Sequence, residues 1–205
     1  MTKIKICGIT NLEDALFAAD AGADALGFNF YQKSPRYIDP LEAQKIIESL
    51  PPLIAVVGVF VNEPEPNRVA EMASQLKLTA IQLHGDESPD YCAQLSDWRV
   101  TKALRVSSTF RPEHAGRYNV SAVLLDAYKA GEYGGTGEIF EWDIAIQAKK
   151  FAKIILAGGL NPLNVADAVR AVQPFAVDVA SGVESSPGKK DRNKVREFVI
   201  KAKSV

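Results

Sequence analysis

Residues 53–61 read LIAVVGVFV, an almost continuous run of apolar and β-branched side chains. A strand with one solvent-exposed face alternates apolar and polar residues. This run does not alternate, so it predicts a strand covered on both faces, as in a parallel sheet. Before it, Asp39-Pro40 predicts a helix start, with Asp as the N-cap and Pro in the first helical position. That helix extends to about Leu50, and another is predicted within residues 65–75. The run is therefore a strand between two helices.

The same strand-and-helix unit repeats along the chain. The predicted strands are residues 3–7, 25–30, 53–61, 80–83, 100–106, 122–126, 153–157 and 175–179. Helices are predicted between them, with starts at the capping-box spacing of Thr10–Glu13, at Ser88-Pro89 and at Asn161-Pro162, whereas residues 109–119 indicate no clear helix. This alternation predicts a single (β/α)8 barrel domain over residues 1–205. An open doubly wound sheet is the rival, although no G-x-G-x-x-G motif follows the first strand.

The composition excludes several classes of protein. Twenty-four basic and 25 acidic residues give a net charge of −1, which lacks the electrostatic signature of a nucleic-acid or anionic-membrane partner. No apolar stretch approaches the ~20 residues that span a bilayer, and the start MTKIKICGIT does not resemble a secretion leader. Two cysteines, Cys7 and Cys92, indicate reduced thiols in the cytoplasm. With only His84 and His114, a histidine-rich metal centre is not expected.

Barrel active sites lie at the carboxyl ends of the strands, where Cys7 ends the first strand. The ordinary interpretation of Cys7 is a small buried thiol without a catalytic role. Because strand side chains alternate, Lys5 and Cys7 point to the same side. If that side is the barrel interior, the Lys5 ammonium would favour the Cys7 thiolate, the form that accepts a proton.

Asp126 ends the apolar strand Ala-Val-Leu-Leu-Asp. A carboxyl group there is either a helix cap or hydrogen-bond anchor, or a catalytic group whose ionisation is tuned by apolar surroundings. The glycine-rich segment that follows, with glycines at 131, 134, 135 and 137, suits a plain flexible loop or a closing lid.

Two more glycine loops follow the seventh and eighth predicted strands. They contain Gly158 and Gly159 in the first, and Ser181 and Gly182 in the second. Barrel phosphate sites are often built from these two loops and a short extra helix, so we expect a phosphate site there.

Three further polar residues are candidate ligand contacts. Arg36, in a basic loop after the second strand, is suited to a bidentate pair with a carboxylate, although a solvated turn is the ordinary interpretation. His84 ends the fourth strand and suits a ligand contact or a structural role equally. Asp178 is expected to line the barrel, where it needs a partner such as Lys5.

Taken together, the motifs resemble those of the phosphoribosylanthranilate isomerases of tryptophan biosynthesis. They span the chain in the family's order: Lys5–Thr10, Gly27–Phe30 with Lys33–Tyr37, Gln82–Gly85, Leu125-Asp126 with Gly134–Gly137, Leu156–Leu160 and Val177–Glu184. Asn29 and Gln32 depart from the family pattern, in the motif that bears on the aryl pocket.

The resemblance implies a cofactor-free and metal-free Amadori rearrangement of N-(5-phosphoribosyl)anthranilate. By position it implies that Cys7 is the general base, Asp126 the general acid and Arg36 the contact to the anthranilate carboxylate, with the glycine loops binding phosphate. The alternatives are another phosphosugar-binding barrel and a phosphate-binding module without turnover. The sequence leaves monomer and homodimer open.

Overall fold

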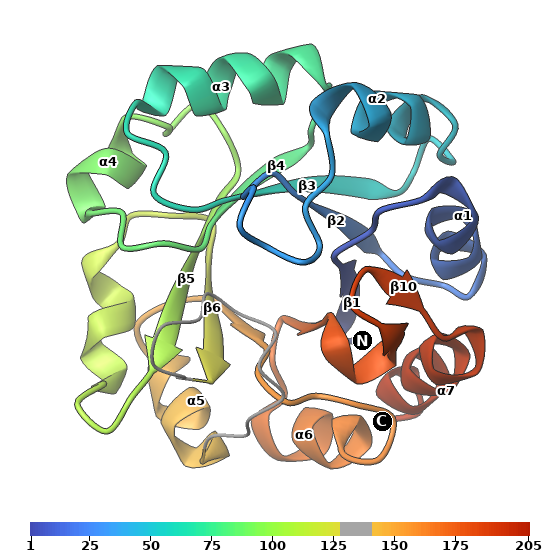
Figure 1. Cartoon of the computed structure of the whole chain (residues 1–205). Helices are drawn as coiled ribbons and strands as arrows, with labels where there is room; N and C mark the ends of the chain where they lie inside the picture. Colours follow the sequence, from blue (N-terminus) through green and yellow to red (C-terminus); the bar gives the residue numbers. More distant parts are fainter. Residues whose placement is uncertain (128–140) are drawn as a thin grey trace.

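A computed structural model describes residues 1–127 and 141–205. Within them, eight parallel strands close into a barrel in the order β1 to β8, with helices around the outside (Figure 1). The strands are β1 Lys3–Cys7, β2 Ala25–Asn29, β3 Ala55–Phe60, β4 Ala80–Leu83, β5 Val100–Val106, β6 Ala122–Ala127, β7 Ile154–Leu156 and β8 Ala176–Val179. Closure comes from the pairing of β1 with β8, which excludes the open-sheet rival and confirms the predicted barrel.

The helices are α1 Leu12–Asp20, α2 Pro40–Glu48, α3 Pro66–Gln75, α4 Pro89–Ala93, α5 Trp142–Ala148, α6 Val165–Val172 and α7 Arg192–Lys203. Several begin as their sequence predicts: Asp39 and Ser88 each cap a helix whose first residue is proline. Asp191 accepts hydrogen bonds from two backbone N–H groups at the start of α7. In the described part of the chain, no helix is both long enough and apolar enough to cross a membrane.

The apolar side chains form two groups. The larger lies between the strands and the helices, and includes Ile4, Leu26, Phe28 and Phe198. The smaller consists of Ala103, Ala122, Leu124, Ile155, Ala157 and Ala176, all in or next to β5 to β8. Because strand side chains alternate, the residues between these apolar positions supply the other face of each strand. Lys5 alternates with Ile4 and Ile6 of the larger group, whereas Asp126 and Asp178 lie two residues after Leu124 and Ala176, on the same face as the smaller group. All three of these polar residues are buried.

Some local predictions are wrong. The capping box at Thr10–Glu13 does not form, because Asn11 caps α1 and the Thr10 hydroxyl donates instead to the carbonyl of Gly188. Helix α6 begins at Val165, since Asn161 and Asn164 bond each other and form a turn before it. Residues 112–117, for which no helix was predicted, form the 3₁₀ helix η1.

A short antiparallel hairpin, β9 Glu184–Ser186 with β10 Lys189–Lys190, was also not predicted. It follows a 3₁₀ turn, η2 Ser181–Val183, after β8. The predicted glycine loop at 131–137 lies outside the described residues.

Candidate active site

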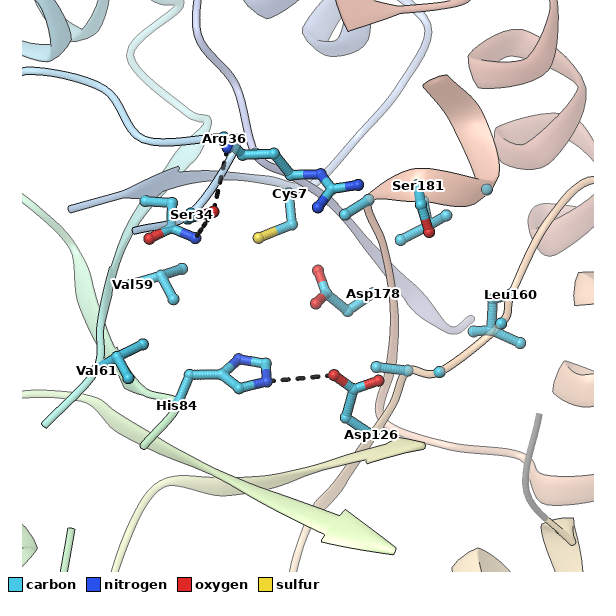
Figure 2. Close-up of a pocket in the computed structure, with 18 residues that line it drawn as sticks. Cys7, Ser34, Arg36, Val59, Val61, His84, Asp126, Leu160, Asp178 and Ser181 are labelled. Carbon is cyan, nitrogen blue, oxygen red and sulfur yellow. Dashed lines mark hydrogen bonds and ion pairs between the residues drawn. The ribbon is translucent and has the colours of Figure 1, made fainter. Parts of the chain in front are cut away.

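One pocket at the carboxyl ends of the strands gathers the side chains and loops that the sequence singled out (Figure 2). Its lining includes Cys7, Arg36, His84, Asp126, Gly158, Gly159, Asp178, Ser181 and Gly182. The Cys7 side chain lies across the pocket from the Asp126 carboxyl group (Figure 2), as expected for the ends of β1 and β6 in an eight-stranded ring. Residues up to 175 positions apart in the chain thus face one cavity.

Cys7 lies beside a buried ion pair. Lys5 and Asp178 face each other in the register of β1 and β8, and the Lys5 Nζ lies 2.8 Å from the Asp178 Oδ1. Asp178 therefore has the partner that its burial requires. Gly27 on the neighbouring strand makes room, since a Cβ there would lie 2.7 Å from the Cys7 Sγ and 3.0 Å from the Lys5 Nζ. The expected proximity of Lys5 to Cys7 is confirmed.

The prediction that Lys5 favours the Cys7 thiolate is only partly right. Burial raises the pKa of the Cys7 thiol, and the Asp178 carboxylate acts in the same direction. The Lys5 and Lys190 ammonium groups lower it, but the net pKa lies above that of an ordinary thiol. Desolvation of the thiolate outweighs the favourable charge because the same lysine is shared with Asp178. The thiol form of Cys7 is therefore favoured over the thiolate at neutral pH.

This gives a titration that can be measured. In a Cys92→Ala variant, we expect iodoacetamide to alkylate Cys7 at a rate that keeps rising with pH beyond the point where free cysteine levels off. A raised pKa means less thiolate at any given pH, and only the thiolate reacts. Lys5→Met removes a cation that lowers the pKa of Cys7, so alkylation should need a still higher pH. A rate that already levels off near neutral pH would contradict this assignment.

Asp126 is held at both carboxyl oxygens. The backbone N–H of Ala127 donates to Oδ1 at 2.9 Å, and the His84 Nε2 lies 3.2 Å from Oδ2. Both side chains are buried. The position of the carboxyl group is therefore fixed by strand β6 itself and by the residue that follows β4.

The two glycine loops meet at one side of the pocket. Gly158 and Gly159 have φ angles of +77° and +63°, a left-handed conformation that favours glycine. Gly182 packs against the first loop so closely that a Cβ would lie 1.9 Å from the carbonyl oxygen of Leu160. Backbone, rather than side chains, therefore lines this end, which leaves amide groups within reach of an anionic ligand.

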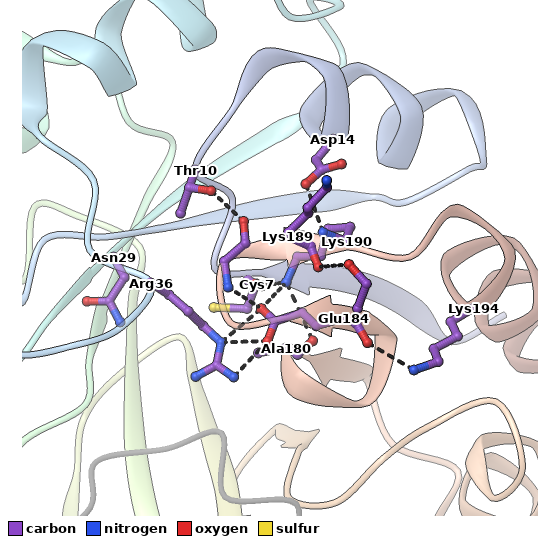
Figure 3. Close-up of polar contacts among 12 residues, drawn as sticks. Cys7, Thr10, Asp14, Asn29, Arg36, Ala180, Glu184, Lys189, Lys190 and Lys194 are labelled. Carbon is purple, nitrogen blue, oxygen red and sulfur yellow. Dashed lines mark hydrogen bonds and ion pairs between the residues drawn. The ribbon is translucent and has the colours of Figure 1, made fainter.

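Arg36 already has a carboxylate partner, which the sequence did not indicate. Its Nε donates to both Glu184 oxygens, at 2.9 and 3.1 Å, and its Nη2 donates to Oε2 at 2.8 Å (Figure 3). This bidentate pair uses one edge of the guanidinium and fixes its plane. A ligand carboxylate would therefore meet the other edge, formed by Nη1 and the second Nη2 proton.

Lys190 also binds Glu184 and forms a cluster with it and Arg36. Its Nζ lies 2.9 Å from the Glu184 Oε1 and donates to the Cys7 carbonyl at 2.6 Å. Burial lowers the pKa of Lys190, although Glu184 partly restores it. With two cations on one carboxylate, Arg36, Glu184 and Lys190 carry a net charge of about +1 when all are ionised. This end of the pocket is therefore suited to an anion.

Glu184 and Lys190 are the site residues that sequence reasoning missed. Glu184 closed a motif but had no assigned partner, and Arg36 lies 148 positions away. Lys190 belongs to the hairpin that was not predicted. The only available signal for Glu184 was a second carboxylate, after Asp178, in a segment of otherwise small or apolar residues, Val177–Glu184.

Comparison with known proteins identifies the family of the chain. Residues 4–201 match the family model described as N-(5′phosphoribosyl)anthranilate (PRA) isomerase. The chain is 57% identical over 205 residues to the N-(5′-phosphoribosyl)anthranilate isomerase of Geobacter sp. (strain M21), covering 100% of both chains. It is 53% identical over 204 residues to that of Geobacter metallireducens, again covering 100% of both.

Solved structures agree as well. The phosphoribosyl anthranilate isomerase of Thermotoga maritima superposes with a TM-score of 0.91 at 44% identity, covering 100% of both chains. A structure of such an isomerase in complex with reduced 1-(o-carboxyphenylamino)-1-deoxyribulose 5-phosphate superposes with a TM-score of 0.88, with the same identity and coverage. With its barrel, its pocket and these similarities together, the chain belongs to the N-(5′-phosphoribosyl)anthranilate isomerase family.

Proposed function

We propose that this chain converts N-(5-phosphoribosyl)anthranilate into 1-(2-carboxyphenylamino)-1-deoxyribulose 5-phosphate, with Asp126 as general acid and Cys7 as general base. The observation that carries the proposal is one pocket lined by the Asp126 carboxyl group, the Cys7 thiol, the Arg36 guanidinium and two backbone loops. The substrate needs all four: a proton donor, a proton acceptor, a partner for its carboxylate and a partner for its phosphate.

The first step is ring opening. Asp126 donates a proton to the ribose ring oxygen as the C1–O bond breaks, and the amine lone pair forms a C1=N bond. A carboxyl group that faces the sugar from one side of the pocket can make this transfer when it carries the proton. The two hydrogen bonds to Asp126 from Ala127 and His84 hold the carboxyl group in a fixed position.

The second step is proton abstraction. The iminium acidifies the hydrogen on C2, which the Cys7 thiolate removes. The C–H electron pair forms a C1=C2 bond and the C=N pair returns to nitrogen, giving an enol-amine that tautomerises to the ketone. Cys7 acts in the fraction of molecules in which the thiol has released its proton to solvent, and since its pKa is raised, this thiolate is a strong base.

The non-reacting ends of the substrate supply positioning. We propose that the glycine loops with Gly158, Gly159, Ser181 and Gly182 bind the phosphate, and that the free edge of Arg36 binds the anthranilate carboxylate. His84 and Asp178 also line the pocket and are proposed to contact the sugar. Anchors of this kind lower the entropic cost of aligning the reacting atoms. Two free buried thiols, Cys7 and Cys92, fit a cytoplasmic enzyme.

The test is a turnover assay. Substrate formed freshly from anthranilate and phosphoribosyl pyrophosphate should lose its anthranilate-type fluorescence when the protein is added. Binding of the substrate or of phosphate without loss of fluorescence would support a phosphate-binding module instead. Turnover of a different sugar phosphate in place of this substrate would support another phosphosugar-binding barrel.

Arg36→Met should mainly weaken substrate binding. We expect KM to rise by at least about tenfold, because a charge-assisted bidentate contact contributes roughly 1.5–3 kcal/mol, while kcat changes much less. Steady-state kinetics measures both values. An analogue without the carboxylate should bind the unchanged protein and the variant alike. If the unchanged protein already binds that analogue as tightly as the substrate, the assignment of Arg36 is wrong.

A further inference from the structure

Gln82 lies beneath the active site and lines no part of the pocket, yet its side chain reaches the proposed acid through His84. It belongs to β4, two residues before His84, so the two side chains point to the same side of the strand. Only 1% of Gln82 is exposed. Its Nε2 lies 2.8 Å from the His84 Nδ1, and the His84 Nε2 in turn lies 3.2 Å from the Asp126 Oδ2. Figure 2 shows the second of these contacts.

The amide nitrogen determines where the histidine proton lies. An amide NH₂ group only donates hydrogen bonds, so the Nδ1 that faces it must accept one and carries no proton. The proton of the neutral ring is then on Nε2, which donates to the Asp126 Oδ2. The imidazolium form is disfavoured as well, because its Nδ1–H would point at the amide N–H.

We propose that Gln82 is a positioning residue, which holds His84 neutral with its proton on Nε2 so that His84 donates to Asp126 and does not accept from it. This inference rests on the proposed role of Asp126 as the acid. Oδ1 already accepts from Ala127 and Oδ2 from His84, and the acid proton of Asp126 is then free to pass to the substrate.

Both other forms of His84 would impair the acid. With its proton on Nδ1, the ring would offer the Nε2 lone pair to Asp126 and take the acid proton into a hydrogen bond between the two side chains. As an imidazolium, His84 would be a cation beside Asp126 and would hold it as a carboxylate. Among the described residues, the other ionisable groups lining the pocket are Cys7, Arg36 and Asp178, of which Arg36 is paired with Glu184 and Asp178 with Lys5.

Nitrogen-15 NMR of the imidazole rings tests the tautomer directly. The chain has two histidines, so in a His114→Gln variant all imidazole signals come from His84. At neutral pH we expect the unchanged protein to show an unprotonated Nδ1 and a protonated Nε2 at His84. Gln82→Glu places an acceptor opposite Nδ1 and should shift the signals to a protonated Nδ1. A protonated Nδ1 in the unchanged protein would overturn the inference, even if the variant fails to fold.

Kinetics tests the consequence for the reaction. Gln82→Glu should lower kcat by at least about tenfold, since acid–base catalysis contributes typically 10²–10⁴-fold and the acid is disabled indirectly, with KM within about threefold. Gln82→Met, which removes the donor without adding an acceptor, should give a smaller loss. Thr101→Val is the matched control: Thr101 lies opposite Gln82 in β5 and is similarly buried, and its replacement should leave kcat unchanged.

The possible failures are distinguishable. Full turnover by Asp126→Asn would show that Asp126 is not the general acid, whatever tautomer His84 adopts. If Asp126→Asn loses turnover while folded Gln82→Glu keeps the kcat of the unchanged protein, only the role of Gln82 is wrong.

Discussion

Asp126→Asn should lower kcat by at least about a hundredfold, because general acid catalysis contributes typically 10²–10⁴-fold, with little change in KM. The amide has nearly the shape of the carboxyl group, so it can occupy the same place between Ala127 and His84. It has no proton acidic enough to pass to the ring oxygen. Steady-state measurement of the fluorescence loss gives kcat and KM separately.

The control for Asp126→Asn is a variant that disturbs a buried carboxylate elsewhere. Glu87 is buried and paired with Lys102 at 2.8 Å, outside the pocket lining. Glu87→Gln should lower the thermal midpoint of unfolding but leave kcat close to that of the unchanged protein. Full turnover by Asp126→Asn would refute the acid assignment.

Cys7→Ala should cause a loss of similar size, at least about a hundredfold in kcat. Among the described residues on the β1 side of the pocket, removal of the sulfur leaves only the Lys5 ammonium and the Asp178 carboxylate, which are held together in an ion pair, so neither is free to accept the C2 hydrogen. The phosphate loops and Arg36 are untouched, so KM should change little. Steady-state kinetics again separates kcat from KM.

Cys92 provides the matched control for Cys7. It is equally a buried free thiol, and burial raises its pKa to about 11, but it lies in α4 on the outside of the barrel. Cys92→Ala should therefore retain kcat, whereas Cys7→Ser, which keeps a hydroxyl in place of the thiol, should remain slow. A Cys7→Ala enzyme with full turnover would refute the assigned base.

The barrel was predictable because each local signal agreed with the global fold. The run at 53–61 is apolar on both faces, and the structure places β3 within it. The capping predictions held where the cap is purely local, as at Asp39 and Ser88. Thr10 failed because its hydroxyl has a partner, Gly188, at the other end of the chain. A tertiary contact of this kind leaves no trace in the local pattern.

The same distinction applies to the site. Cys7, Asp126 and the glycine loops could be predicted because the barrel places every strand end at one face. The protonation of Cys7 could not, because it depends on Asp178 sharing Lys5 and on burial. Nor could the pairing of Arg36 with Glu184, because two loops from opposite ends of the sequence form it.

The pairing of β1 with β8 has a consequence for synthesis on the ribosome. Chain growth delivers β1 first and β8 last, so the ring stays open until residues 176–179 have emerged. Until then β1 and the newest strand each have an unpaired edge, the feature that makes nascent sheets prone to aggregate. Until then Lys5 lacks the Asp178 carboxylate, and the Cys7 carbonyl lacks the hydrogen bond that Lys190 donates. Ring closure and assembly of the reactive thiol's surroundings are therefore the same late event.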